Sequence, residues 1–161
     1  MTVKQVEETM LAALQPSYGS ADAIRIEQVP LPRVGPDDVR IQVRTASLNF
    51  GDRMVLQGRP LLFRPLAYGL GRPANRIAGM AAAGIVVEVG AAVTDWKVGD
   101  PVFGELGRGA LAEHVLAKAG ELARKPEAVT FEAAATIPVA GTTALQGLVL
   151  AGTKPGQRVL V

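Results

Sequence analysis

The sequence contains no cysteine and a single histidine, His114, among its 161 residues. The absence of cysteine excludes disulfide bonds, thiolate zinc ligands and cysteine nucleophiles. One histidine cannot build a metal site that needs several imidazole ligands, so we expect no bound metal. A Ser-His-Asp arrangement would depend on His114 alone, and its place in a strand-like pattern favours a structural role.

The sequence also lacks targeting segments and a strong excess of charge. Its first nine residues include Lys4, Glu7 and Glu8 and no apolar core, which is not typical of a signal peptide. We find no stretch of about 18 apolar residues that would predict a membrane span. Lysines and arginines number 17 against 15 acidic residues, and they are scattered. These features predict a cytoplasmic protein that binds neither nucleic acid nor an anionic membrane.

Alternation of apolar and polar residues predicts that the first two thirds of the chain are mainly β. The pattern predicts strands at residues 10–14, 23–28 and 39–44, and a buried strand within residues 77–89, where glycine and alanine allow close backbone approach. Residues 93–99 should form a turn around Trp96. Two further strands, at 100–104 and 110–117, should be joined by a hairpin at residues 107–109.

Helix signals are few and concentrated near the C-terminus. Asn49 or Asp52 can cap a short helix that ends at Gly58, and the arginine-bearing residues 59–76 should form a loop. Thr130 can cap a helix over residues 131–137 that ends at Pro138. A second helix over residues 142–150 and a strand at 159–161 should follow. The expected fold is a mainly β, partly open barrel followed by two helices and the first strand of an α/β domain.

Four segments, in this order and spacing, resemble the medium-chain dehydrogenase/reductase superfamily, in particular its zinc-independent, quinone-oxidoreductase-like branch. They are residues 47–52 (SLNFGD), 79–90, 98–104 (VGDPVFG) and 133–148, the last leading to 156–161 (GQRVLV). The resemblance implies a GroES-like barrel domain beside a Rossmann domain, with NADPH or NADH bound between them. It implies a small-molecule substrate: a quinone, a carbonyl compound or an activated alkene.

The resemblance divides the chain into an N-terminal extension (1–9), a GroES-like domain (10–127) and the start of a nucleotide-binding domain (128–161). No glycine-rich phosphate loop follows the strand at 159–161, so the Rossmann domain would be incomplete. We therefore expect the isolated chain to be inactive. We also expect its unpaired C-terminal strand to promote self-association.

By resemblance, Asn49, Asp52 and Thr143 lie at the nicotinamide end of the cofactor cleft. Each residue type also has a purely structural alternative, because Asn and Asp cap helices and form turns, and Thr143 would lie near a helix N-terminus. Zinc-dependent relatives carry a His-Glu pair where Met80 and Ala81 stand, which agrees with the expected absence of metal. The sequence assigns no catalytic residue.

Two hypotheses of function follow. The chain is the substrate-side part of a zinc-free NAD(P)H-dependent oxidoreductase, or it is a GroES-like binding module without catalysis. Saturable binding of NADPH would contradict the second hypothesis.

Overall fold

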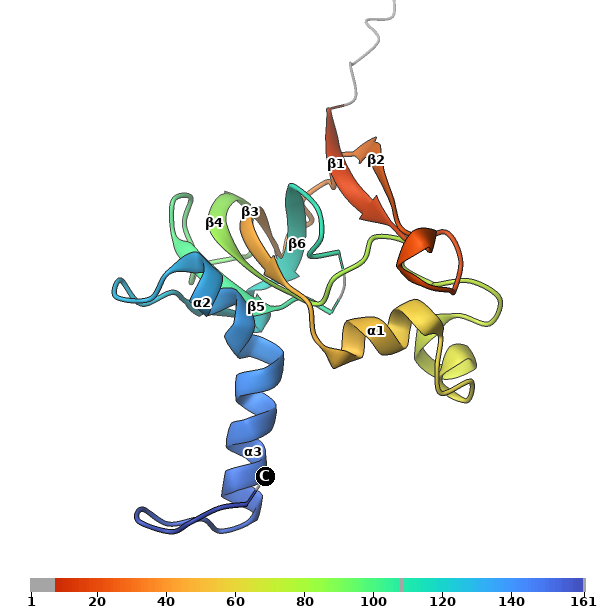
Figure 1. Ribbon diagram of the computed structural model, residues 1–161. Coiled ribbons are helices and arrows are strands. Elements are labelled where there is room, and N and C mark those ends of the chain that lie inside the picture. Colours follow the sequence, from red (N-terminus) through yellow and green to blue (C-terminus); the bar gives the residue numbers. More distant parts are fainter. Residues whose placement is uncertain (1–7, 108, 161) are drawn as a thin grey trace, which may run out of the picture.

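The computed structural model describes residues 8–107 and 109–160, and its fold is mainly β, as the sequence predicts (Figure 1). A five-stranded antiparallel sheet has the strand order β6-β3-β4-β5-β7, and β1 pairs with β2 in a separate hairpin. The strands are β1 (Thr9–Leu14), β2 (Arg25–Pro30), β3 (Asp38–Ser47), β4 (Ala81–Val89), β5 (Pro101–Glu105), β6 (His114–Lys118) and β7 (Leu122–Arg124).

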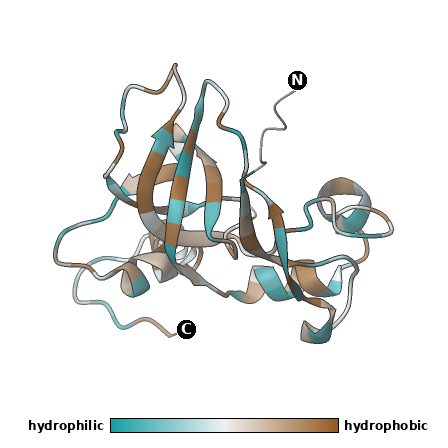
Figure 2. Cartoon of the chain, turned by 90° about the horizontal axis from the view of Figure 1, so that it is seen from above, coloured by the Kyte–Doolittle hydropathy of each residue, from teal (hydrophilic) through white to brown (hydrophobic). Residues whose placement is uncertain are grey.

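The predicted N-terminal extension lies mostly outside the described residues, and Thr9 already belongs to β1. Isolated bridges join Ala12 to Ala112 and Leu14 to Ile77, so β1 is also bonded to the segments that precede β6 and β4. Figure 2 shows hydrophilic and hydrophobic bands alternating along the strands. This alternation is the two-residue period from which the strands were predicted.

Side chains from the central strands of the larger sheet form the core. Its largest fully buried side chains are Val39, Ile41, Val86 and Val102. Gly84 lies where β4 meets β3, and a Cβ atom there would stand 2.2 Å from the Gln42 carbonyl oxygen. The close backbone approach predicted from the small residues of this segment is therefore present.

The predicted hairpin between residues 100–104 and 110–117 is wrong. β5 pairs with β4 and β7, whereas β6 lies at the opposite edge of the sheet and pairs with β3. The connecting segment instead hydrogen-bonds to residues 78–80 and to β1: the Leu111 amide donates to the Ala78 carbonyl, and the Ala13 amide donates to the Leu111 carbonyl. These non-local bonds override the local turn signal of the two glycines at 107 and 109.

The helices are α1 (Phe50–Gln57), α2 (Phe131–Thr136) and α3 (Thr142–Leu150), with short helical turns η1 (Ala21–Ala23), η2 (Arg64–Tyr68), η3 (Ala119–Glu121) and η4 (Ile137–Gly141). Thr130 caps α2 as predicted, since its side chain accepts a hydrogen bond from the Ala133 amide. Ala134 and Ala135 of α2 are fully buried in a cluster with Ala83 of β4. Small side chains therefore hold α2 close to the sheet.

Pro138 does not end the helix, contrary to the prediction. The wide turn η4 contains Pro138, and the Thr142 amide bonds back to the Ile137 carbonyl, so α2 continues through η4 into α3. The wider turn accommodates a residue that has no amide hydrogen. The resulting helix, Phe131–Leu150, has a mean hydropathy of 1.4 over an 18-residue window and passes a length and composition test for membrane-crossing helices. By length and composition alone, this helix could cross a membrane, and 17% of the window is buried within the described structure. This finding corrects the expectation that no segment of the sequence is long and apolar enough to do so.

The strand predicted at residues 159–161 is not formed over 159–160, and Val161 lies outside the described residues. A strand needs a neighbour to satisfy its backbone groups, and the described part of the chain offers this segment none. Val159 and Leu160 are exposed, as are Leu148, Val149 and Leu150 of α3. The proposed division of the chain at residue 128 stays a prediction, because α2 packs against the sheet of the preceding segment.

The exposed C-terminal apolar residues predict concentration-dependent self-association. Removing residues 153–161 should reduce it, because exposed apolar side chains gain from being buried between chains. Sedimentation of the full chain beside the shortened chain measures the effect. Monomeric behaviour of both chains at the same high concentration would show that the prediction is wrong.

A second prediction concerns the buried Asp100 in the turn before β5. Its carboxylate accepts a hydrogen bond from the Lys97 amide and forms a 3.0 Å ion pair with Arg124. The Arg124 guanidinium holds the pKa of Asp100 below its ordinary value. A lowered pKa stabilises the fold above the ordinary Asp pKa, and this contribution is lost as the pH falls through the lowered value.

Asp100→Asn should therefore lower the melting temperature at pH 7, and the difference from the wild type should shrink below about pH 4. Thermal melts followed by circular dichroism from pH 7 to 3 measure this. Asp95→Asn, an exposed position in the same turn, is the control and should show little change. A difference between Asp100→Asn and the wild type that does not vary with pH would contradict the prediction.

Candidate functional site

Helix α1 begins with a reciprocal pair of hydrogen bonds between Asn49 and Asp52. The Asn49 Oδ1 atom accepts from the Gly51 amide at 2.8 Å and from the Asp52 amide at 3.4 Å. The Asp52 Oδ2 atom accepts from the Asn49 amide at 2.9 Å. This is a capping box, in which each side chain satisfies a backbone donor that the helix leaves free. Gly58 ends the helix in the left-handed conformation, as predicted.

The capping box leaves two polar atoms without partners. Asn49 Nδ2 and Asp52 Oδ1 are buried and make no hydrogen bond within the described part of the chain. Such atoms are rare in native structures because their desolvation is uncompensated. The pair is thus a buried donor and a buried acceptor that the described residues leave unsatisfied.

Burial raises the pKa of the Asp52 carboxyl, although the backbone amides of Asn49, Asp52 and Met80 act in the opposite direction. The protonated form is therefore easier to reach at Asp52 than at an exposed aspartate. A carboxyl that retains its proton can donate a hydrogen bond as well as accept one.

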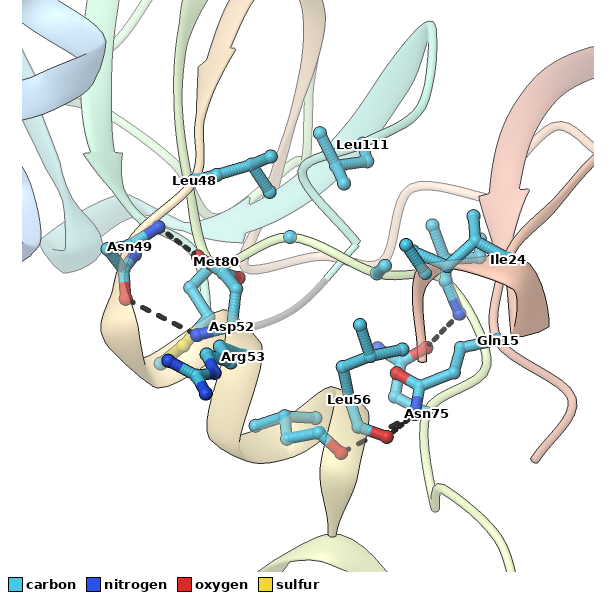
Figure 3. A pocket seen from close by; sticks show the side chains of 15 residues that line it. Gln15, Ile24, Leu48, Asn49, Asp52, Arg53, Leu56, Asn75, Met80 and Leu111 are labelled. Carbon is cyan, nitrogen blue, oxygen red and sulfur yellow. Dashed lines mark hydrogen bonds between the residues drawn. The ribbon is translucent and has the colours of Figure 1, made fainter. Parts of the chain in front are cut away.

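Asn49 and Asp52 lie at one end of a cavity of about 210 Å³ between α1, the end of β1, η1 and residues 75–80. Figure 3 shows Asn49, Asp52 and Met80 grouped at that end, and Gln15, Leu56 and Asn75 at the other. Most of the lining is apolar. The lining residues are Gln15, Ala21, Ile24, Leu48, Asn49, Asp52, Arg53, Val55, Leu56, Asn75, Ile77, Ala78, Gly79, Met80 and Leu111.

Gln15 fixes the far end of the cavity and was missed in the sequence. It is only 3% exposed, and its amide nitrogen donates to the Leu56 carbonyl at 3.0 Å and to the Val55 carbonyl at 3.4 Å. These bonds join the end of β1 to the end of α1 across some 40 residues of sequence. No local pattern marks Gln15, whereas its place after Gly79 marks Met80 in the sequence.

The structure brings Asn49 and Asp52 together but does not place Thr143 with them. Thr143 lies on α3, outside the cavity lining, and its hydroxyl donates to the Val139 carbonyl at 2.7 Å. A hydroxyl that donates can still accept a hydrogen bond, so Thr143 retains a free acceptor for a ligand. The cofactor contacts expected of Asn49, Asp52 and Thr143 all stay predictions.

The other titratable candidates lie elsewhere. His114 is at the start of β6, outside the cavity lining, with a buried Nδ1 atom that has no partner in the described residues. Burial and the nearby Arg40 lower its pKa, which favours the neutral imidazole. Within residues 8–107 and 109–160, no three side chains of the types His, Cys, Asp or Glu gather as a metal site would require.

Comparison with known proteins identifies the family. The chain matches the family described as alcohol dehydrogenase GroES-like domain over residues 35–127. It is 32% identical to the chloroplastic NADPH-dependent alkenal/one oxidoreductase of Arabidopsis thaliana, over 97% of this chain and 41% of that protein. It is 37% identical to the chloroplast envelope quinone oxidoreductase homolog of the same plant, over 90% of this chain and 45% of that protein.

The structure resembles that of the quinone oxidoreductase from Coxiella burnetii with a TM-score of 0.80 and 30% sequence identity, covering 92% of this chain and 47% of that one. The chain thus spans less than half the length of these relatives. It belongs to the GroES-like domain family of the alcohol dehydrogenases, in the quinone-oxidoreductase-like branch of the medium-chain dehydrogenase/reductase superfamily.

The raised pKa of Asp52 gives a testable result. A carboxyl whose pKa is raised in the folded state favours folding when protonated, and this advantage is lost as the pH rises through the raised value. Asp52→Asn keeps an oxygen that can accept from the Asn49 amide but carries no charge. The stability of the wild type relative to this variant should therefore increase as the pH falls from 7 to about 4.

Urea unfolding at several pH values measures this difference. Acidification should therefore change the relative stability at Asp52 in the direction opposite to that at Asp100, whose pKa is lowered. A wild type that loses stability relative to Asp52→Asn on acidification would show that burial does not dominate at this carboxyl.

Proposed function

We propose that this chain forms the substrate side of a metal-free NAD(P)H-dependent reductase that acts on a quinone, a carbonyl compound or an activated alkene. The observation that carries the proposal is the apolar cavity with Asn49 and Asp52 at one end. Apolar walls suit the carbon skeleton of such a substrate, and a few polar atoms at one end suit its oxygen. The names of the relatives, an alkenal/one oxidoreductase and quinone oxidoreductases, agree with this substrate class.

The residues of the site take distinct roles in this proposal. The Asn49 Nδ2 group donates a hydrogen bond to the substrate oxygen and polarises the carbonyl or quinone. Asp52 positions Asn49 through the capping box, and both residues line the same end of the cavity. The nicotinamide, when bound, supplies the hydride. Thr143 is assigned to the nicotinamide by resemblance, and its free lone pair fits a carboxamide donor.

Other parts of the proposal rest on sequence positions. Met80 and Ala81 stand where zinc-dependent relatives have ligands, which supports a reaction without metal. The inactivity expected of the isolated chain stays a prediction. A cytoplasmic location also stays a prediction.

A titration of the chain with a small cyclic enone tests the substrate site. Amide NMR shifts should change at Asn49, Met80 and Leu111, which line the cavity, and not on β2. Asn49→Ser keeps a capping oxygen at the start of α1 but removes the Nδ2 donor, so it should fold normally and bind the enone roughly tenfold more weakly. Thr143→Ala is the matched control and should bind the enone as the wild type does. Shifts outside the cavity, or equal affinity of Asn49→Ser, would contradict the proposed site.

The second candidate function is a binding module without catalysis, because an apolar cavity with a few polar residues can hold a small molecule without a cofactor beside it. Residues 8–107 and 109–160 offer no glycine-rich loop to the pyrophosphate, and contacts worth several kcal/mol correspond to a thousandfold or more in NADPH affinity, at about 1.4 kcal/mol per tenfold change. Calorimetric titration of the chain with NADPH should thus show no saturation in the micromolar range. Saturable micromolar binding of NADPH would exclude the second candidate. Binding of the enone without measurable binding of NADPH would leave the proposed substrate-side role intact.

A further inference from the structure

The segment of residues 59–76, here called the arginine loop, exposes an unusual run of large apolar side chains. It contains η2 and extends beyond the end of α1, away from the five-stranded sheet (Figure 1). Single exposed apolar residues are normal on protein surfaces, but a cluster marks an interaction surface. The exposed apolar residues, with their exposed fractions, are Leu61 (64%), Leu62 (72%), Phe63 (45%), Leu66 (76%) and Leu70 (76%).

Defined contacts hold the arginine loop in this conformation. The Tyr18 hydroxyl donates to the Gly69 carbonyl at 2.6 Å, and Arg64 Nε donates to the Gly58 carbonyl at 2.9 Å. The Arg64 guanidinium also lies 4.3 Å from the centroid of the Tyr18 ring. The arginine loop is thus anchored to Tyr18, which follows β1, and to Gly58 at the end of α1, while its leucines remain exposed to solvent.

The charge of the arginine loop is of one sign. Between Arg53 and Val87 the sequence has five arginines, at positions 53, 59, 64, 72 and 76, and no acidic residue. Arg64 is engaged with Tyr18 and Gly58, whereas Arg53, Arg59, Arg72 and Arg76 are exposed. The net charge of +2 for the whole chain conceals this local excess, because the acidic residues lie in other segments.

We propose that the arginine loop is a docking surface for an anionic lipid bilayer. The exposed leucines insert at the boundary between headgroups and acyl chains, and the arginines bind lipid phosphates. Charge complementarity together with the apolar run favours this partner. A soluble phosphate or a nucleic acid would use the arginines and leave the leucines in water. This proposal reverses the sequence-based expectation of no contact with anionic membranes and is independent of the proposed enzymatic function.

Vesicle flotation tests the proposal with the full chain. Vesicles of phosphatidylcholine alone are compared with vesicles that contain about one third phosphatidylserine, at about 0.15 M salt. The chain should float with the anionic vesicles, and binding should fall at high salt. Leu62→Ser combined with Leu66→Ser should weaken binding roughly tenfold or more, and Arg72→Gln about fivefold.

Matched controls change residues of the same type elsewhere on the surface. Leu150→Ser, at the exposed end of α3, and Arg25→Gln, on β2, should bind as the wild type does. Thermal melts establish that every variant is folded. Failure to float with anionic vesicles, or equal loss in loop and control variants, would overturn the proposal.

Two further outcomes would assign the lipid contact to another surface, or the arginine loop to another partner. Binding to neutral vesicles that is lost in Leu150→Ser would place the lipid contact on the helix Phe131–Leu150 and overturn the proposal. Binding of a single-stranded oligonucleotide that depends on Arg72 but not on Leu62 and Leu66, in the absence of vesicle binding, would also overturn it. Such a result would identify a polyanion site instead.

Discussion

The capping box at the start of α1 is the interaction on which the candidate site depends. It joins β3 to α1 at Asn49 and Asp52 and uses one side-chain oxygen of each residue for the helix. The remaining nitrogen of Asn49 and the remaining oxygen of Asp52 are buried without a partner among the described residues, and both residues line the cavity. Capping and ligand binding are therefore compatible roles of the same two side chains. The cap removes rotational freedom from Asn49 before any ligand arrives, and such preorganisation lowers the entropic cost of binding.

The opposite end of the cavity depends on a contact of a different kind. Gln15 donates to carbonyl groups at the C-terminal end of α1, where the last carbonyls of a helix lack partners within the helix. Both ends of α1 are thus held by polar side chains, and the apolar residues between them form one wall of the cavity. Closing the cavity would require these hydrogen bonds at the two ends of α1 to break.

The parts of this structure that could be predicted from sequence are those set by local signals. Asn49, Gly58 and Thr130 mark helix ends through contacts within a few residues, and the central strands alternate with a clear period. The hairpin prediction failed because the residues that follow β5 bond to β1 and to residues 78–80, which lie far away in sequence. Gln15 escaped notice for the same reason. β7, with three residues, is too short to show any periodicity.

The incorrect prediction that a helix ends at Pro138 also affects the expected position of Thr143. Ending the helix there separates α2 from α3, whereas the wide turn η4 makes them continuous and carries Thr143 along the helix. The direction of that helix is set at its beginning, where Ala134 and Ala135 pack against Ala83 with no large side chain between them. The position of Thr143 therefore follows from alanine packing on β4, and that of Asn49 from the cap at the end of β3. Because β3 and β4 pair along most of their length, Asn49 and the beginning of the helix that carries Thr143 are held by adjacent strands of the same sheet.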